Sequence, residues 1–237
     1  MHVHIFSPSH LGFACERHRV YALLLRKDSL CLAVPWGNAA LFKNLFYRTP
    51  KLPGSVHLRA PPGLVEDHIR LMAQARRMPP QQCDGSPWRF QHVCSSGKRK
   101  CINAYLEKAR EKVNTNGGTN DDLDDTDFII EPEQYPTFGG ITVRAPALTR
   151  SAQPYSFKRK RVILAEEKLE VMGLPVFAPN NFPVHTPFKD LLFTPELSDA
   201  HVHGMMGNAM HVAAESSMPM VGLGCTKRAA PSAVDLG

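Results

Sequence analysis

The sequence predicts an α/β fold, and three patterns along its 237 residues lead to this class. Apolar and polar residues alternate at the N-terminus, which is the period of a β-strand. In Lys98–Lys112 and again in Val162–Met172, apolar residues recur every three or four positions, which is the period of a helix. Stretches rich in proline and glycine separate these segments and predict loops.

The first residues are expected to form two antiparallel strands. Val3 and Ile5 alternate with histidines in the first strand, and Val20–Leu25 forms the second. Pro8 and Gly12 mark the loop between them. Because this connection is short, the two strands are expected to pair with each other.

The middle of the chain is expected to be mostly irregular. Residues 27–97 contain many prolines and glycines, with one short helix predicted over Glu66–Arg76. The helix over Lys98–Lys112 has the clearer apolar stripe. It leads into Asn114–Asp127, an acidic segment rich in asparagine and glycine that predicts a mobile surface loop.

Short strands are predicted at Phe128–Ile130 and Gly140–Val143. The helix over Val162–Met172 is expected to stop at Gly173, since glycine is common just after a helix end, and Pro175 cannot continue it. A proline-rich loop should follow.

The last predicted element is a helix over Ala209–Ser217. Asn208 precedes it and can cap its free N–H groups. Residues beyond Met218 are expected to fray, and 221–237 are predicted to be a disordered tail.

Composition narrows the classes of function. The formal charge of +6 and the pI of about 9.1 favour an anionic partner such as nucleic acid. The six cysteines have irregular spacing and no CxxC, which predicts free thiols and an intracellular location. No apolar run approaches the ~20 residues of a membrane span. Four residues are potential zinc ligands, namely Cys83, His92, Cys94 and Cys101. Their spacing fits no common zinc module.

Arg17 and Arg19 are the first candidate site. Alternate residues of a strand share a face, and two adjacent cations there favour an anion or the edge of a nucleobase. A solvated edge strand with ordinary surface charges is the simpler interpretation of these two residues alone.

The densest basic run is the second candidate. Lys158–Arg161, flanked by Tyr155 and Phe157, has the composition of a phosphate-contacting patch with aromatic neighbours. A solvated loop and a short nuclear-targeting signal are the alternatives.

Gly207 and Asn208 form the third candidate, because the start of a helix presents free N–H groups to a carboxylate or phosphate. An ordinary capped helix is the alternative. His201 and His203 lack a third metal ligand and are expected to be surface histidines.

Three segments together resemble the C-terminal half of DNA cytosine-5 methyltransferases. The segment GFACERHRVY resembles the family motif that contains two arginines in the pattern R-x-R. Gly12, Arg17, Arg19 and Tyr21 match it, whereas the residues at 14 and 15 depart from the proline and glutamine of that family.

The other two segments follow in the family's order. APALTRS and RVILAEEKLEVMGLP (145–151 and 161–175) resemble the proline-threonine-leucine stretch and its helix, matching at Glu167, Gly173 and Pro175. Leu164 replaces the family's N-cap threonine. Gly207, Asn208 and Ala209 match the glycine–asparagine–small residue motif that opens the last helix, and His211 replaces a common proline.

The resemblance implies methyl transfer from S-adenosylmethionine to a cytosine that is flipped out of double-stranded DNA. It implies that Arg19 faces the carbonyl oxygen of the cytosine, that Arg17 organises the site, and that Asn208 and Ala209 contact the amino-acid end of the cofactor. The nucleophilic cysteine of the family lies in a Pro-Cys pair upstream of R-x-R. No Pro-Cys occurs in these 237 residues, so the chain is expected to be inactive alone.

This resemblance assigns most of the chain to parts of the family's fold. Residues 1–26 correspond to a remnant of the catalytic domain, 27–144 to an irregular α+β target-recognition region, and 145–220 to the closing motifs and C-terminal helix. The implied fold is a partial S-adenosylmethionine-dependent methyltransferase fold, and the implied partners are double-stranded DNA and an N-terminal half. The location would be nuclear in a eukaryote. A non-catalytic DNA-binding remnant and an unrelated basic interaction protein are the alternatives.

Overall fold

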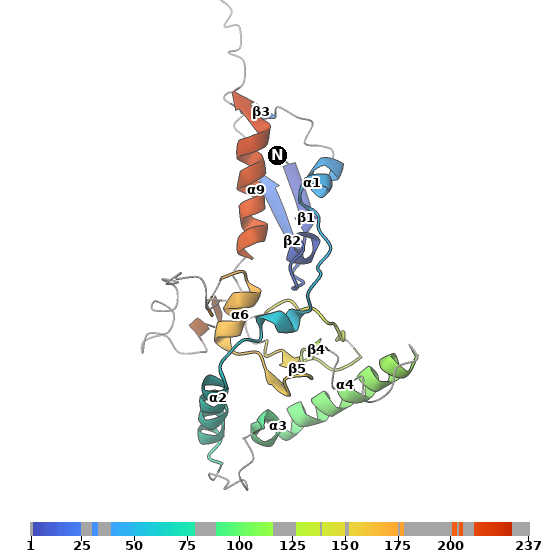
Figure 1. Ribbon diagram of the computed structural model, residues 1–237, viewed down its shortest axis with the longest axis vertical. Helices are drawn as coiled ribbons and strands as arrows, with labels where there is room; N and C mark the ends of the chain where they lie inside the picture. Colours follow the sequence, from blue (N-terminus) through green and yellow to red (C-terminus); the bar gives the residue numbers. More distant parts are fainter. Residues whose placement is uncertain are drawn as a thin grey trace, which may run out of the picture.

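The protein is a mixed α/β chain whose elements are spread along one long axis (Figure 1). One end holds the first two strands with the helices at 39–46 and 212–225, and the other holds a small sheet with the helices at 62–75, 90–93 and 96–115. The helix at 165–171 lies between the two ends. The computed structural model describes residues 2–24, 30–32, 39–78, 89–115, 127–137, 139–149, 152–174, 176–177, 201–202, 204–205 and 211–228.

Strands β1 (His2–Phe6) and β2 (Arg19–Leu23) form the expected antiparallel pair. Phe6 and Tyr21 lie on one face of this hairpin with their rings stacked 4.3 Å apart. The other face carries the cross-strand pair Ile5 and Val20, which are 65 % and 64 % exposed. One face of the hairpin is therefore packed, and the other is apolar and open to solvent.

Two helices cover the packed face. Phe42 of α1 (Ala39–Phe46) lies 5.0 Å from the Phe6 ring, and Ala214 of α9 (Val212–Cys225) belongs to the same buried cluster. Helix α1 lies in the stretch that was expected to be irregular. Its sequence, AALFKNLF, places Phe42 and Phe46 four residues apart on one face, which is a helical spacing.

The end of the chain corrects a prediction. Helix α9 continues past Met218 to Cys225 with Pro219 inside it, and β7 (Thr226–Arg228) then pairs antiparallel with β3 (Leu30–Leu32). Residues 221–228 are therefore ordered in helix and strand, whereas the sequence predicted a disordered tail. Because proline usually interrupts a helix, the pattern alone favoured an earlier end.

The other end of the molecule is built on a three-stranded sheet. Its order is β4 (Ile129–Ile130), β5 (Tyr155–Ser156) and β6 (Arg161–Val162), all antiparallel. The predicted strand at Gly140–Val143 is reduced to one bridge between Ile129 and Thr142.

Three helices pack on this sheet through the largest buried cluster. Helix α2 is Pro62–Ala75, α3 is Phe90–Val93 and α4 is Ser96–Thr115, which confirms the helices expected over 66–76 and 98–112. Helix α2 begins before its predicted start because Pro62 fits the first helical turn. The cluster holds Ile69, Ala73, Phe90, Val93, Cys94, Ile102, Tyr105, Ala109, Val113, Phe128, Ile130, Tyr155, Phe157 and Val162.

Helix α6 (Ala165–Val171) joins the two ends of the molecule. Leu164 is its N-cap residue, and its side chain cannot accept a hydrogen bond from the first turn of the helix. The other half of a capping box is present, because Glu167 Oε2 accepts the backbone N–H of Leu164 at 3.1 Å. The helix stops as predicted, with Gly173 at a φ of +81° just beyond it.

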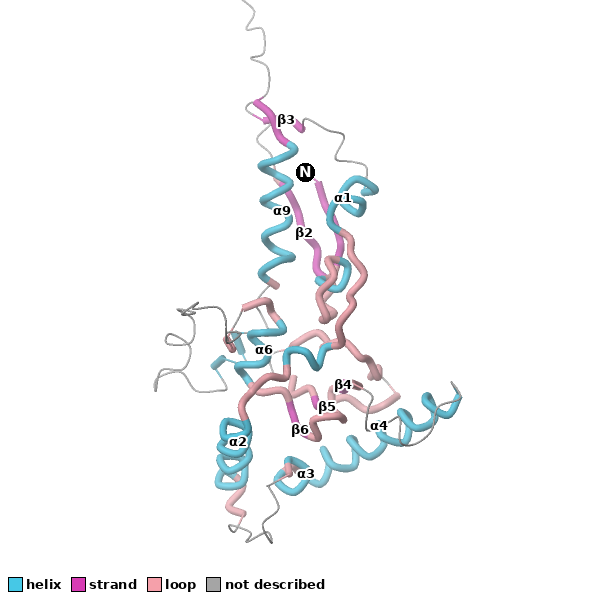
Figure 2. The backbone as a smooth tube through the Cα atoms, in the orientation of Figure 1, coloured by secondary structure: helices cyan, strands magenta, loops and turns pink. Residues whose placement is uncertain are grey.

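The packing crosses the domain boundary that the sequence placed after residue 144. Strands β5 and β6 lie beyond this boundary and pack with α2, α3 and α4, which precede it. Helix α1 also precedes it and packs on the N-terminal hairpin. The long connection between α1 and α2, most of it loop, runs along the molecule between its two ends (Figure 2).

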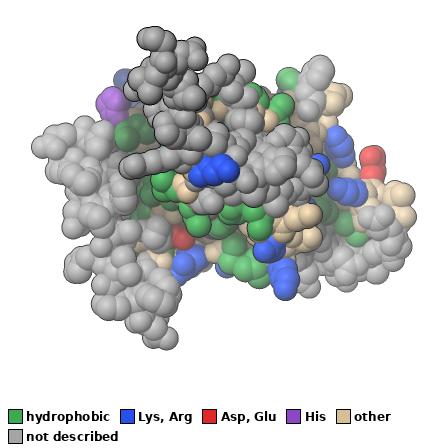
Figure 3. All heavy atoms as spheres, turned by 90° about the horizontal axis from the view of Figure 1, so that it is seen from above, with side chains coloured by type: hydrophobic (Ala, Val, Ile, Leu, Met, Phe, Trp, Pro, Cys, Tyr) green, Lys and Arg blue, Asp and Glu red, His purple; other side chains and the backbone are tan. Residues whose placement is uncertain are grey.

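Figure 3 shows the molecule from above. Among the described side chains in this view, lysines and arginines stand at several separate places, with hydrophobic side chains between them. Among the residues that the structure describes, no helix has the length and hydropathy needed to cross a membrane.

Several sequence predictions fall outside the described residues. They concern most of the acidic loop over 114–127, the proline-rich loop beyond Phe177, and the helix start at Gly207, Asn208 and Ala209.

Candidate nucleic-acid interface

A tight basic turn joins β5 to β6. Residues 157–160 lie between the paired positions Ser156 and Arg161, and Lys160 N–H donates to Phe157 O at 3.2 Å. The backbone N–H of Arg159 donates to Ser156 Oγ at 3.2 Å. Lys158, Arg159 and Lys160 are all exposed on this turn. Three cations on one short, hydrogen-bonded turn can contact successive phosphates of a nucleic acid.

Arg161 does not share that exposure, although it belongs to the same basic run. It is 7 % exposed, and its guanidinium makes two hydrogen bonds of 2.6 Å to the carboxylate of Glu167. Glu167 is fully buried and also accepts the backbone N–H of Ala60 at 3.0 Å. The predicted DNA-contacting set is therefore corrected: Arg161 ties β6 to α6, and Lys158, Arg159 and Lys160 remain as surface cations.

The aromatic neighbours of the basic run are also buried. Tyr155 is 1 % and Phe157 is 7 % exposed, and both belong to the core under the sheet. Burial raises the pKa of Tyr155 to about 12, and Gln91 Nε2 donates to its hydroxyl at 3.2 Å. The prediction of aromatic side chains beside a phosphate patch is therefore wrong, since these rings support the turn from below.

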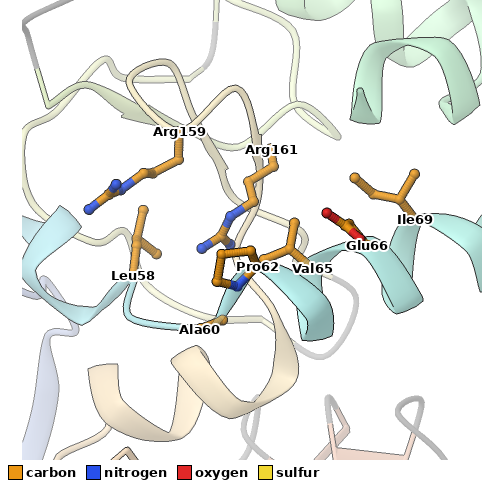
Figure 4. A pocket seen from close by; sticks show the side chains of 8 residues that line it. All are labelled: Leu58, Ala60, Pro62, Val65, Glu66, Ile69, Arg159 and Arg161. Atoms are coloured by element: carbon orange, nitrogen blue, oxygen red, sulfur yellow. The ribbon is translucent and has the colours of Figure 1, made fainter. Parts of the chain in front are cut away.

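A pocket of about 270 Å³ lies between this turn and helix α2 (Figure 4). Arg159 and Arg161 line it on one side, and Pro62, Val65 and Glu66 of α2 line it on the other. Arg159 stands at the edge of a hollow that is apolar over much of its wall. The basic turn therefore adjoins a depression in which an apolar or planar group can lie beside a guanidinium.

The R-x-R segment has a different geometry from the one expected. Strand β2 begins at Arg19, so Arg17 lies before the strand and does not share a strand face with it. Arg17 is 3 % exposed, and its Nη1 donates to Leu148 O at 2.5 Å. Burial, with a smaller contribution from the like charge of Arg19, lowers the pKa of Arg17. The solvated-edge alternative is therefore wrong for Arg17.

Arg19 is only partly buried, and its Nη1 donates to His18 O at 3.0 Å. It lies directly opposite Phe6 in the hairpin, on the face that carries Tyr21. Burial raises the pKa of Tyr21, and the positive charge of Arg19 opposes that rise. Arg19 is thus the arginine of the pair that can reach a ligand. Arg17 is instead occupied by its hydrogen bond to the backbone carbonyl of Leu148.

The segments around Arg17 meet others from far along the chain. Cys15 forms a parallel bridge with Ala145, the Glu16 N–H donates to Ala145 O at 2.9 Å, and Arg144 pairs with Glu16 at 2.8 Å. Cys15 is 2 % exposed, and burial raises the pKa of its thiol to about 12. A thiol that stays protonated is a poor nucleophile, so Cys15 is a packing residue.

His211 lies between the R-x-R segment and the end of α6. Its ring lies 4.6 Å from Phe13 and against Gly173, where an added Cβ would sit 3.1 Å from His211 Cε1. The next residue, Val212, donates its N–H to Met172 O at 3.0 Å. The start of α9, the end of α6 and the R-x-R segment therefore share one packed junction.

Stability should depend on pH through His211. Burial, with a smaller contribution from His57, lowers the pKa of His211 from 6.5 to about 4, and the side chain is 2 % exposed. The unfolded chain takes up a proton below pH 6.5, whereas the folded chain does so only near pH 4. Stability is therefore lost as the pH falls through this window, by up to about 3 kcal/mol. Chemical denaturation of the wild type and of His211→Phe at several pH values measures this loss.

The control is His92→Phe, which changes an exposed histidine on α3. Its stability should fall with pH as the wild type's does, whereas His211→Phe should lose less. Equal pH profiles for all three proteins would contradict a role for His211.

The remaining predicted site residues stay untested by the structure. Asn208, Ala209 and His203 lie outside the described residues, so the fit of a cofactor to Asn208 and Ala209 remains a prediction. Among described side chains, Cys15, Cys94 and Cys101 carry free thiols. No group of three or more potential metal ligands occurs in the described part of the chain.

Two buried residues that stabilise this region, Glu167 and Lys168, were not predicted as such from the sequence. Glu167 appeared only as a family match, although its place three residues after the N-cap of α6 is a known signal for contact with the cap N–H. Lys168 was not singled out, yet it is 1 % exposed and its Nζ donates to Ala152 O. Burial lowers the pKa of Lys168 to about 8. No local pattern distinguishes this lysine from a surface one.

Comparisons with known proteins assign the chain to no family. No protein-family model matches the chain, and no curated protein matches it either. Any assignment of function therefore depends on the motifs quoted above and on where the structure places them.

Proposed function

We propose that this chain is the C-terminal part of a DNA cytosine-5 methyltransferase. In this proposal, the region around the R-x-R segment belongs to a partial S-adenosylmethionine-dependent methyltransferase fold. Residues 27–144 supply the target-recognition region, and double-stranded DNA is the substrate. S-adenosylmethionine would supply the methyl group, with Asn208 and Ala209 at its amino-acid end. The protein would act inside the cell, in the nucleus if its source is eukaryotic.

The observation that carries the proposal is the contact between motif segments that are far apart in sequence. Arg17 donates to Leu148 O at 2.5 Å, which joins GFACERHRVY to APALTRS. Gly173 contacts His211, which joins the end of the α6 segment to the start of α9. The family resemblance implies that these segments form one site, and their packing on one another supports the proposal.

The N-terminal hairpin supports the same proposal. Val3, Ile5 and Val20 are 47 %, 65 % and 64 % exposed, and the sheet they lie on has only two strands among the described residues. A two-stranded sheet is marginally stable alone, and such an apolar face favours coverage by another element. An N-terminal half, with further strands of the same fold, is the partner that this proposal implies.

Roles for the arginines follow from their placement. Arg19, partly exposed, would face the carbonyl oxygen of the flipped cytosine. Arg17, buried against the 145–149 segment, would position the loop that leads to Arg19. Because these 237 residues contain no Pro-Cys and the Cys15 thiol is buried, residues 1–237 alone should transfer no methyl group.

A non-catalytic DNA-binding remnant is the second candidate. The exposed turn at Lys158, Arg159 and Lys160 favours it, because this turn needs no nucleophile or cofactor to contact phosphates.

The nucleotide sequence upstream of Met1 separates the two candidates. The methyltransferase proposal predicts an open frame that encodes a Pro-Cys pair and a glycine-rich loop after a strand. In-frame stop codons directly upstream, with no such polypeptide encoded elsewhere in the genome, would contradict it and favour the remnant.

A further inference from the structure

A second pocket is lined neither by the basic turn nor by Arg17. It has a volume of about 440 Å³ and lies between residues 11–14 and residues 48–57. The two segments are held together by a parallel bridge between Leu11 and Arg48 and by the Arg48 N–H, which donates to His10 O at 2.7 Å. Gly12 has a φ of +91°, and a Cβ there would lie 3.0 Å from Arg48 Cβ. The close approach that shapes this pocket therefore requires glycine.

The walls of the pocket are mainly apolar. Leu11 and Phe13 come from one segment, and Leu52 and Val56 come from the other. Leu52 is 60 % and Val56 is 38 % exposed, so both present apolar surface to solvent. Apolar surface gathered around a hollow of this volume is typical of small-molecule sites, which usually measure ~300–1,000 Å³.

The polar groups of the pocket are basic. Arg48 and Lys51 are exposed on the same loop, and neither forms an ion pair with a described residue. Arg48 Nη1 donates to the carbonyl of Tyr47 at 2.7 Å, which leaves other guanidinium N–H groups for a ligand. No lining residue is acidic. The two cations therefore favour an anionic group on the ligand.

His57 supplies the third kind of contact. It lines the pocket and is partly buried, and burial lowers its pKa, an effect that Glu170 opposes. A neutral imidazole offers one donor and one acceptor, which suits the edge of a heterocyclic base.

We propose that this pocket binds a nucleotide, with the base against Phe13 and the apolar walls and the phosphate on Arg48 and Lys51. Phe13 offers an aromatic surface for a flat ring, and the cations suit a phosphate better than a neutral ligand. Both a free nucleotide and an unpaired nucleotide within a DNA strand present this chemistry. The inference does not depend on methyl transfer, and it concerns a site separate from the basic turn.

Fluorescence titration of residues 1–237 with 2-aminopurine riboside 5′-monophosphate tests the proposal. The probe should bind at least about tenfold more tightly than the same nucleoside without phosphate, because charge-assisted hydrogen bonds are lost with the phosphate. Equal affinity for the two compounds, or no binding of either the nucleotide or a 2-aminopurine-containing single strand, would overturn it.

Variants locate the binding in the pocket. Arg48→Ala with Lys51→Ala should weaken nucleotide binding at least about tenfold. Leu52→Glu changes an exposed wall residue and should weaken it as well. The matched control, Lys43→Ala with Arg70→Ala, removes two exposed cations outside the pocket and should bind as the wild type does. Wild-type affinity in both pocket variants would contradict the assignment.

The source of the nucleotide follows from one comparison. A single-stranded oligonucleotide that carries 2-aminopurine is titrated with and without a competing free nucleotide. Displacement by the free compound identifies a free-nucleotide site, and binding of the base only within a strand identifies a strand site. In either case, weaker binding by the Arg48→Ala with Lys51→Ala variant assigns the binding to this pocket, and unchanged binding contradicts the proposal.

Discussion

Glu167→Gln is expected to destabilise the protein by about 3–5 kcal/mol, because it leaves the Arg161 guanidinium buried without its counter-charge. Glu167 is fully buried and accepts hydrogen bonds from Arg161 and from the backbone N–H groups of Ala60 and Leu164. Donors from two distant parts of the chain, Ala60 and the stretch 161–164, therefore converge on one carboxylate. Urea denaturation of the purified variant, followed by circular dichroism, measures the change in the free energy of unfolding.

The matched control is Glu107→Gln on α4, where the carboxylate pairs with Arg110 at 2.6 Å. Both partners are exposed, so this change should cost no more than about 1 kcal/mol. Adding Arg161→Leu to Glu167→Gln should recover part of the stability that Glu167→Gln loses, because no buried charge remains and the glutamine oxygen can still accept a backbone N–H. Equal costs for the two glutamines would show that the Arg161–Glu167 pair has no special structural role.

Replacing Lys158, Arg159 and Lys160 together with alanine should weaken duplex DNA binding roughly ten- to hundredfold at about 0.1 M salt. All three side chains are exposed on the turn between β5 and β6, and a phosphate that contacts Lys158 has to compete with Asp127, whose Oδ1 lies 3.5 Å from Lys158 Nζ. The dependence of the logarithm of the affinity on the logarithm of the salt concentration should become shallower by about 2–3. Fluorescence anisotropy with a labelled duplex measures both quantities. Arg161 is left in place because its change would affect folding.

The control for this triple change keeps the same net charge. Arg70, Arg76 and Arg110 are cations on α2, just after it, and on α4, and their replacement with alanine removes the same charge from elsewhere. It should leave most of the binding intact. An equal loss in both triple variants would assign the binding to overall charge, and binding that ignores salt would argue against a phosphate contact.

The elements with a strong local pattern could be predicted from the sequence. The apolar stripe of α4 and the glycine that ends α6 both depend on neighbours a few residues away, and both predictions are confirmed. The pairing of β1 with β2 is also confirmed, because strands that follow one another along a chain usually pair. Helix α1 was missed because the surrounding prolines and glycines dominated the pattern.

The candidate site was harder to predict because its residues are set by contacts between distant segments. Within Lys158–Arg161, nothing local distinguishes Arg161 from its neighbours, yet it alone meets Glu167. Arg17 and Arg19 differ in the same way, because only Arg17 meets Leu148. Alternation predicts which residues share a strand face, but it does not predict where the strand begins.

The central claim is that this chain is part of a cytosine-5 methyltransferase, and methyl transfer tests it most directly. Residues 1–237 are assayed with labelled S-adenosylmethionine and duplex DNA, alone and with the polypeptide that the upstream reading frame encodes. The proposal predicts no labelled 5-methylcytosine from residues 1–237 alone, and labelled 5-methylcytosine once the upstream polypeptide is present or joined to it. Labelled cytosine from residues 1–237 alone, or none from the combination, would contradict it.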